Sequence, residues 1–420
     1  MNGRTPLLFC GASRRLAKPR IRKVVEECAV IRALSTSHTA GDREDAGGES
    51  RGDRHYAMAC ADVFKPRRGM LGSMRKDGQD AVDRRHFVTV VTAGIATQLA
   101  LAPEDAAAQT PPARAIASTE PLPPDNGLFK GFTARWVRTN GAKIFLRHGG
   151  EGPPLLMLHG NPQTHACFHK IAGTLAERFH VVVADLRGYG DSVGPTDGGK
   201  DHENYSFRAM AQDQVDVMAA LGHERFFVAG HDRGARTAHR MALDHKERVR
   251  KVALLDILPT RHVWANISRD WALNSWHWVF MAQPDEMFER MIAAIPAREF
   301  VLRHLGRTGK PEFFDDRAVA EYVRCFTPKT IHGSCEDYRA AAGIDLIHDE
   351  ADHKAGSRIG APLLTLWGSR SHTGRFYGGD LLSIWRAEAE SVSGGAIDSG
   401  HYLVEEAPLT VLAAFDRFFV

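Results

Sequence analysis

The sequence has none of the features that mark several large protein classes. No apolar run reaches the ~18 residues that a membrane-spanning helix needs, and the net charge of +3 is too small to indicate a nucleic-acid partner. Six cysteines lie far apart without a Cys-x-x-Cys pair, which argues against a zinc ribbon, a redox dithiol and a disulfide framework. Metalloprotease, phosphate-loop and dinucleotide-binding motifs are absent, so we expect no metal and no organic cofactor.

The first hundred residues differ in composition from the rest. Residues 1–108 hold five more basic than acidic side chains, whereas the remainder holds two more acidic ones. Residues 1–83 lack a sustained apolar period and are predicted to be a disordered leader. Residues 84–108 begin with paired arginines, continue with a moderately apolar stretch and end in three alanines, which is the order of a bacterial twin-arginine signal peptide. We expect export to the periplasm; if this stretch is instead an amphipathic helix, the protein is cytoplasmic.

The position of the signal predicts a later start of translation. Such signals normally lie at the extreme N-terminus, and Met70 and Met74 lie just upstream of the paired arginines. We therefore expect translation to begin at one of these methionines. The mature chain would start near Gln109 with a proline-rich linker over residues 109–128.

From residue 129 on, short β-branched runs alternate with stretches of helical periodicity. The expected strands are 132–137, 143–147, 154–159, 181–185, 225–230, 251–257, 362–367 and 394–397, and the expected helices are 163–179, 206–221, 235–245 and a last one from 408. This alternation predicts an α/β fold with a mostly parallel, doubly wound sheet. Residues 259–350 lose the alternation and are predicted to be a helical cap, inserted after the sixth strand into a core of residues 129–258 and 351–420. The cap would cover the carboxyl ends of the strands, where such sheets bind ligands.

The segment Gly230-His231-Asp232-Arg233-Gly234 follows one expected strand and opens a helix. Gly-x-Ser-x-Gly in that context is the nucleophile elbow of the α/β-hydrolase fold. Here Asp232 replaces the serine. A carboxylate is a poor nucleophile toward acyl carbon, but it can displace a leaving group from saturated carbon, and water then hydrolyses the resulting ester. The motif therefore predicts an α/β-hydrolase that is not an esterase, lipase or peptidase.

The partners of the nucleophile are expected in the chain order nucleophile, acid, histidine. Asp256 ends the next strand and His401 follows the last one. We expect His401 to take a proton from water and Asp256 to fix the tautomer of its imidazole. The backbone N–H groups of Asn161 and Arg233 are the candidate donors to the oxyanion.

Arg233 and Arg236 lie one helical turn apart beside the nucleophile. Two arginines there suggest a bidentate clamp for the carboxylate of an anionic substrate. The cap supplies hydrogen-bond donors in Trp276-His277-Trp278 and in Cys335-Glu336-Asp337-Tyr338, and three converging donors would suit a small hydrated anion such as halide. Aromatic residues of this kind also serve simply as cap core.

With these segments in view, the chain resembles the haloacetate and fluoroacetate dehalogenases of the α/β-hydrolase superfamily. The resemblance runs from about Phe132 to the C-terminus and rests on HGNPQTH, DLRGYGDS, GHDRGAR, LLDILPT, WHWVFMAQP, CEDYRAAA and SGHYLVEEAP. It implies hydrolysis of a short 2-haloacid to the 2-hydroxy acid and halide through an aspartyl ester. The roles that it implies are nucleophile and triad for Asp232, Asp256 and His401, carboxylate ligands for Arg233 and Arg236, and halide donors for His277, Trp278 and Tyr338.

Two segments depart from that family's pattern. An aromatic residue usually follows His-Gly, where this chain has Asn161; the His-Gly-Asn-Pro form is similar to haloalkane dehalogenases, in which that Asn helps to bind halide. Residues 371–379 are atypical as well. The sequence therefore leaves open whether fluoride or chloride is released and how large a substrate fits.

Two other functions compete with this interpretation. An epoxide hydrolase uses the same Asp-His-Asp triad, but it needs two cap tyrosines, for which only Tyr322 and Tyr338 are available, and a neutral epoxide needs no arginine pair. A ligand sensor on this scaffold commonly lacks a triad member, whereas this chain keeps all three. We expect a small anionic substrate and water as partners, and the sequence leaves a homodimer open.

Overall fold

The computed structural model of the chain describes residues 120–306 and 310–420. The predicted leader, signal peptide and first part of the linker lie outside these described residues and stay predictions. Within the described part, none of the helices is both long and apolar enough to cross a membrane.

An eight-stranded sheet forms the centre of the described part, in the order β1-β2-β4-β3-β5-β6-β7-β8. The pairs β1–β2 and β2–β4 are antiparallel and the other pairs are parallel, which confirms the predicted mostly parallel sheet. The strands are β1 (Thr133–Arg138), β2 (Lys143–Gly149), β3 (Pro154–Leu158), β4 (His180–Ala184), β5 (Phe226–His231), β6 (Val249–Leu255), β7 (Leu363–Gly368) and β8 (Val392–Ile397).

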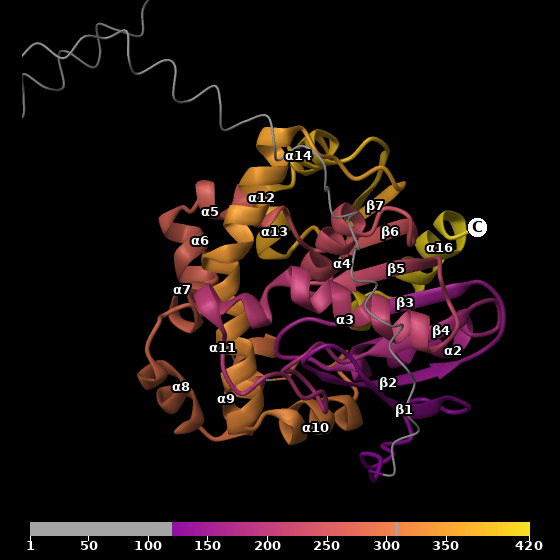
Figure 1. Cartoon of the computed structure of the whole chain (residues 1–420), viewed down its shortest axis with the longest axis horizontal. Helices are drawn as coiled ribbons and strands as arrows, with labels where there is room; N and C mark the ends of the chain where they lie inside the picture. The colour runs from indigo at the N-terminus through magenta and orange to yellow at the C-terminus, as the bar shows by residue number, and fades with distance from the viewer. Residues whose placement is uncertain (1–119, 307–309) are drawn as a thin grey trace, which may run out of the picture. The chain divides into compact units, whose positions relative to one another are not determined.

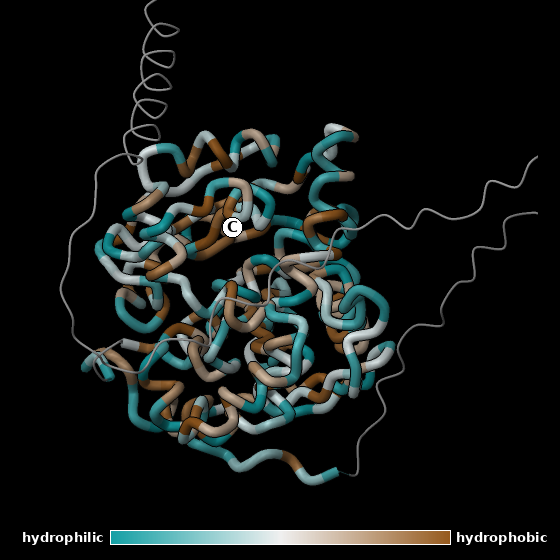
Figure 2. The backbone as a smooth tube through the Cα atoms, turned by 90° about the vertical axis from the view of Figure 1, so that its left-hand side faces the viewer, coloured by the Kyte–Doolittle hydropathy of each residue, from teal (hydrophilic) through white to brown (hydrophobic). Residues whose placement is uncertain are grey.

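The central strands are apolar because both faces of the sheet are covered. Successive side chains of a strand point to opposite faces, so Leu155 and Met157 of β3 pack into one core while Leu156 and Leu158 pack into the other. These four side chains are fully buried. Figure 2 shows several hydrophobic stretches of the tube around the middle of the described part.

Helices flank the sheet on both faces (Figure 1). Those of the core are η1 (His165–Phe168), α2 (His169–Leu175), η2 (Lys200–Tyr205), α3 (Phe207–Ala220), α4 (Arg233–Asp244), α13 (His372–Tyr377), α14 (Leu381–Glu388), α15 (Leu403–Glu406) and α16 (Pro408–Phe418). Of these, η2, α13, α14 and α15 were not expected from the sequence. The helix expected over 163–179 is shorter, because it begins with the 3-10 turn η1 and ends at Leu175.

All the helices between β6 and β7 form one segment, which we call the cap. It consists of α5 (Thr260–Ala265), α6 (Arg269–Asn274), α7 (Trp276–Met281), α8 (Glu286–Ala293), α9 (Ala297–Gly306), α10 (Asp316–Cys325), α11 (Pro328–Ala342) and α12 (Ile344–Ala355). In Figure 1 the helices α5 to α11 gather to one side of the sheet.

The cap is joined to the core by charged and backbone contacts. Arg240 of α4 forms ion pairs with Asp349 and Asp352 of α12. The loop after β4 comes so close to α11 that a Cβ atom on Gly333 would lie 2.6 Å from the Cα of Gly188. Because glycine alone has no Cβ, these two positions let the cap lie directly over the ends of the parallel strands.

Candidate active site

Asp232 lies in the turn between β5 and α4, where its carboxyl group is almost completely buried. Its backbone has φ 50° and ψ −114°, a conformation that residues with a side chain rarely adopt. The turn is tight, since a Cβ atom on Gly234 would lie 2.3 Å from the carbonyl oxygen of Leu158. The structure therefore has the strand–turn–helix elbow that the glycine motif predicts.

The oxygens of the Asp232 carboxylate face different groups. Oδ1 accepts a hydrogen bond from the backbone N–H of Asn161 at 3.0 Å. Oδ2 lies 3.9 Å from Nε2 of His401. A Cβ atom on Gly160 would lie 2.6 Å from Oδ1, so this position must stay open for the carboxylate. One oxygen is thus held by a backbone donor, while the other faces the imidazole.

His401 and Asp256 meet as the chain order predicts. Nδ1 of His401 lies 2.5 Å from Oδ2 of Asp256. The other carboxylate oxygen, Oδ1, accepts hydrogen bonds from the backbone N–H of Gly368 at 2.9 Å and from Oγ of Ser371 at 2.7 Å. Asp256 has a positive φ of 54° directly after β6. With three hydrogen bonds, its carboxylate is held in one orientation and in turn orients the imidazole of His401.

The charges of these groups shift their pKa values in opposite directions. Burial disfavours ionisation of Asp232, but the charges of His401 and the neighbouring arginines outweigh it and hold the Asp232 pKa well below its usual range. Burial also disfavours the imidazolium of His401, yet the hydrogen bond and charge of Asp256 raise the His401 pKa above its ordinary value. Asp232 is therefore ionised at neutral pH, as a nucleophile must be.

The guanidinium of Arg233 is buried and is hydrogen-bonded on one side. Its Nε donates to Oδ2 of Asp337 at 2.7 Å, and Nη2 donates to the Asp337 backbone oxygen at 3.0 Å and to Oδ1. Its guanidinium also lies 4.1 Å from the ring centre of Tyr338. Nη1 makes no hydrogen bond with any described residue. The predicted carboxylate ligand thus keeps a single unpartnered donor group.

Arg236 also has one nitrogen that is hydrogen-bonded and another that has no partner. Its Nη1 donates to the Leu258 backbone oxygen and to Oγ1 of Thr260, each at 2.9 Å, whereas its buried Nε has no partner among the described residues. The guanidinium stacks on Trp278, 4.5 Å from the ring centre. Burial and the charge of Arg233 lower the Arg236 pKa to about 10, so the group stays charged at neutral pH.

The predicted halide donors come together beside these arginines. The ring centre of Tyr338 lies 6.0 Å from that of Trp278 and 5.7 Å from that of His277. The Tyr338 hydroxyl and the Asn161 amide nitrogen Nδ2 are buried without a hydrogen-bond partner among the described residues. Burial raises the pKa of Tyr338 far above its usual value, so its hydroxyl remains a donor.

A cavity of about 580 Å³ opens in front of Asp232. Its wall includes predicted site residues and several further groups: Asn161, Asp232, His277, Trp278, His304, His372 and His401. Arg233, Arg236 and Tyr338 are not part of this wall and lie behind Trp278, with which all three are in ring contact. The structure therefore places Asp232 and His401 in the wall of the cavity, while Arg233 and Arg236 lie outside that wall and contact Trp278, which is part of it.

Comparison with known proteins identifies the family. A family model described as alpha/beta hydrolase fold matches residues 153–375. The chain is 41% identical over 284 residues to a fluoroacetate dehalogenase of Burkholderia sp, which covers 67% of this chain and 91% of that protein. The chain belongs to the haloacetate dehalogenase family of the α/β-hydrolase superfamily.

Other relatives match a similar share of this chain. A soluble epoxide hydrolase of Corynebacterium sp. (strain C12) is 31% identical over 67% of this chain and 94% of its own length. The crystal structure of ALR0039 from Nostoc sp PCC 7120 superimposes with a TM-score of 0.66 and 50% identity, over 69% of this chain and 98% of that one. The superfamily thus includes more than one chemistry, and the site must distinguish between them.

Sequence reasoning about this family member missed four residues around the site. Asp337 was noted only as part of a motif, although it orients Arg233. Ser371 donates a hydrogen bond to Asp256, and Nε2 of His231 donates to the backbone oxygen of His401 at 2.8 Å. His372 lies next to His401, with ring centres 5.3 Å apart, and burial lowers its pKa to about 4. Its position just after β7 could have predicted this proximity, because the carboxyl ends of parallel strands lie at the same edge of the sheet.

The Arg233–Asp337 pair leads to a prediction about stability. Replacing Asp337 with Asn leaves the buried guanidinium of Arg233 without a counter-charge, which should lower the free energy of unfolding by about 3–5 kcal/mol. Asp416→Asn is the matched control, because its pair with Arg178 is about half exposed and should change that value by at most ~1 kcal/mol. Chemical denaturation measures both. Equal effects of the two variants would contradict the prediction.

Proposed function

We propose that the enzyme hydrolyses the carbon–halide bond of a short 2-haloacid, such as fluoroacetate or chloroacetate, to the 2-hydroxy acid and halide. The observation that carries this proposal is the set of buried donors beside an ionised carboxylate. These are Arg233 Nη1, Arg236 Nε, Asn161 Nδ2 and the Tyr338 hydroxyl, none of which has a partner among the described residues. Buried donors are normally satisfied, so four in one place indicate an anionic ligand.

The first step is attack on saturated carbon. Oδ2 of Asp232 displaces the halide from the α-carbon, so that a carbon–oxygen bond forms while the carbon–halogen bond breaks. The carboxylate of the substrate pairs with Arg233 Nη1 and Arg236 Nε. Hydrogen bonds from other nitrogens of these two guanidinium groups to Asp337 and to the Leu258 backbone oxygen hold the groups in place. Their positive charge also offsets the repulsion between the substrate and Asp232.

The leaving halide needs donors at the moment the bond breaks. In this proposal Tyr338, Trp278 and His277 supply them from the cap, and Asn161 Nδ2 supplies a further one from the core. Burial lowers the pKa of His277 far below its ordinary value, so this residue acts as a neutral N–H donor. The aromatic rings around these donors exclude water, which strengthens their interaction with the halide.

The second step hydrolyses the ester. Nε2 of His401 takes a proton from water, and the resulting hydroxide attacks the carboxyl carbon of Asp232. The backbone N–H of Asn161, which already bonds Oδ1, stabilises the oxyanion. The proton then passes from His401 to the departing alkoxide oxygen, which came from Asp232. This restores the carboxylate and releases the 2-hydroxy acid.

The position of the tyrosines favours the haloacid over an epoxide. An epoxide hydrolase with this triad uses two cap tyrosines to donate to the epoxide oxygen, and the cap has Tyr322 and Tyr338. The Tyr322 hydroxyl donates to Oε2 of Glu405 at 3.1 Å, whereas the Tyr338 hydroxyl has no partner among the described residues, so only one of the two tyrosines has a free donor. The unpartnered arginine donors also match a carboxylate and have no role with a neutral epoxide. The fluoroacetate dehalogenase among the relatives supports the same choice.

The substrate class is tested by halide release. Purified protein should release chloride from chloroacetate, and it should release at least tenfold less from chloroacetamide, because the neutral amide cannot pair with two arginines. An ion-selective electrode measures both, with fluoroacetate assayed alongside. Diol formation from an epoxide, with no halide released from either acid, would move the protein to the epoxide hydrolases.

The ester intermediate is tested by trapping. His401→Asn should accumulate a covalent adduct on Asp232 because the ester forms but water is not activated. Asp232→Asn should form none, and Asp416→Asn should behave as the unmodified chain. Mass spectrometry of the intact protein detects the adduct. In a single turnover in H₂¹⁸O, the heavy oxygen should enter Asp232 and not the product; labelled product would exclude the covalent route.

The two steps should differ in their pH dependence. Ester formation needs only ionised Asp232, whose pKa is far below neutral, so its rate should stay constant between about pH 5 and 8. Ester hydrolysis needs neutral His401, whose raised pKa means that protonation sets in as the pH falls, so this rate should decline on the acid side. Rapid quenching should therefore show the ester accumulating at low pH. A parallel decline of both rates would contradict these roles.

We also propose export through the twin-arginine signal at residues 84–108, on the strength of the sequence alone. Cleavage after the alanine run would give a mature chain that starts at Gln109. Expression in a bacterium with a functional twin-arginine pathway, followed by mass spectrometry of the periplasmic fraction, tests this. Replacing both arginines with lysine should keep the uncleaved chain inside the cell.

A further inference from the structure

The cavity in front of Asp232 is larger than a haloacetate needs. Its volume is about 580 Å³. Cavities of ~300–1,000 Å³ commonly hold ligands far bigger than a two-carbon acid. The wall extends from Asp232 and His401 of the core to His304 near the end of helix α9 of the cap. The cavity therefore has room for a substituent on the reacting carbon, and the wall has residues beyond the triad that can contact it.

The imidazole of His304 is held in one orientation. Its ring centre lies 4.4 Å from that of Phe300, 5.4 Å from that of Trp276 and 5.3 Å from that of His277. Its Nδ1 lies 3.1 Å from the backbone oxygen of Phe300, one helical turn earlier. The backbone oxygen of His304 accepts a hydrogen bond from the Tyr402 hydroxyl at 3.0 Å, which ties the end of α9 to the residue after the triad histidine.

The hydrogen bond at Nδ1 decides what the other nitrogen of the His304 ring can do. A carbonyl oxygen only accepts, so Nδ1 carries the hydrogen. Burial lowers the pKa of His304 to about 4, so the ring is neutral at neutral pH, and Nε2 then has a lone pair and accepts. This buried Nε2 has no partner among the described residues. His304 thus supplies an unused acceptor, whereas the unpartnered groups that the proposed reaction uses are donors.

The acceptor lies close to the reacting groups. Because Nδ1 turns back to the backbone of α9, Nε2, at the far edge of the ring, is directed away from that helix. The neighbouring ring of His277 belongs to the same cavity wall and is one of the proposed halide donors. The charge of Asp232 also acts on the His304 ring, where it opposes the effect of burial on the pKa. A substituent on the reacting carbon is therefore within the surroundings of His304.

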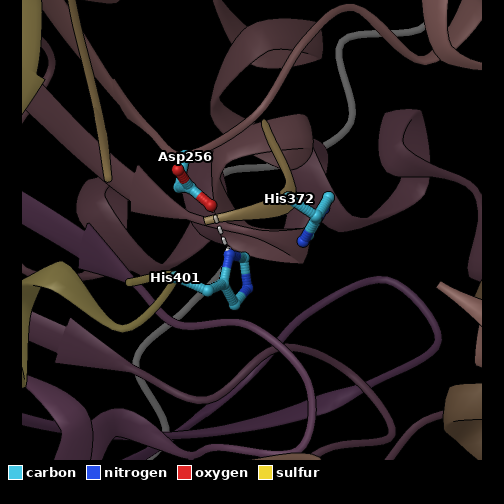
Figure 3. A group of neighbouring side chains, drawn as sticks. All are labelled: Asp256, His372 and His401. Carbon is cyan, nitrogen blue, oxygen red and sulfur yellow. Dashed lines mark hydrogen bonds and ion pairs between the residues drawn. The ribbon is translucent and has the colours of Figure 1, made fainter. Parts of the chain in front are cut away.

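A second histidine of this wall, His372, has no such defined role. Figure 3 shows its ring beside that of His401, whose Nδ1 is bonded to Asp256. The hydrogen bonds of the described residues include none from the His372 ring, so none of these contacts fixes which of its nitrogens carries the hydrogen. Of these two rings, the structure defines an acceptor only for His304.

We propose that Nε2 of His304 accepts a hydrogen bond from a hydroxyl group of the substrate, and that the preferred substrate is a 2-haloacid with a hydroxyl group on its substituent. This inference rests on the proposed dehalogenation. A haloacetate has no donor for Nε2, because its carboxylate and its halogen only accept. An apolar substituent would shield Nε2 from water without replacing the lost hydrogen bond, whereas a hydroxyl would satisfy it.

A pair of substrates tests the acceptor. The acids 2-chloro-3-hydroxypropanoate and 2-chlorobutanoate differ only in a hydroxyl that replaces a methyl group. The unmodified chain should show a kcat/KM about fivefold or more higher for the hydroxy acid, measured as chloride release. His304→Phe keeps an aromatic ring but has no acceptor, so it should bring the ratio of the two kcat/KM values close to one. The change in this ratio between variants is the measure, since it cancels the different intrinsic reactivities of the acids.

Two further variants complete this test. His304→Gln has an amide oxygen that can accept, so it should restore part of the preference, and it serves if the phenylalanine variant does not fold. His169→Phe is the matched control. Nδ1 of His169 lies 2.9 Å from the backbone oxygen of Ala166 in the same kind of contact, but His169 lies outside the cavity wall. This variant should keep the ratio of the unmodified chain.

Binding of the products gives a readout that needs no turnover. By isothermal titration, 2,3-dihydroxypropanoate should bind the unmodified chain more tightly than 2-hydroxybutanoate, and His304→Phe should remove the difference. Chloride release from chloroacetate with the same substrate ratio in the unmodified chain and in His304→Phe would overturn the acceptor role and leave the dehalogenase function intact. Binding of the dihydroxy acid that depends on His304, in a protein that releases no chloride, would uphold the acceptor and refute the dehalogenase function.

Discussion

The buried ion pair between Arg233 and Asp337 is the interaction on which the rest of the site depends. It joins the first residue after the nucleophile to helix α11 of the cap, 104 residues away in the chain. Both side chains are fully shielded from water, so the pair is strong only while core and cap remain packed together. Because the pair fixes one side of the guanidinium, the unpartnered Nη1 group is held in one orientation. The same contact thus holds the cap in place and orients the arginine that we propose binds the substrate carboxylate.

The sequence predicts the sheet and the mutual proximity of Asp232, Asp256 and His401 for a common physical reason. Parallel strands buried on both faces must be apolar throughout, so β3 to β7 stand out as continuous apolar runs, and the chemistry of such sheets lies where these runs end. Asp232, Asp256 and His401 each follow a strand, and their chain order matches the fold. Their relative positions therefore follow from local patterns alone.

Side-chain contacts between residues far apart in the sequence could not be predicted in this way. Spacing places Arg233 and Arg236 beside the nucleophile, but it does not reveal that Asp337 and Thr260 occupy part of each guanidinium. The short helices α13 and α14 were missed because the glycines of residues 374–379 weaken the helical pattern, and with them the positions of Ser371 and His372 were missed. Those contacts depend on how the loop after β7 packs against Asp256, which no local period encodes.

The backbone at Asp232 and Asp256 has a consequence for how this protein can change. Both residues hold a positive φ, which costs roughly 1–3 kcal/mol for a residue with a side chain, and glycine would adopt it without that strain. The two carboxylates therefore lie at positions where glycine would have less backbone strain than aspartate. Glycine in an inactive descendant of this enzyme would remove that strain but lose the hydrogen bonds that the two carboxylates accept, so the backbone conformation and the buried donors favour different residues at these two strand ends.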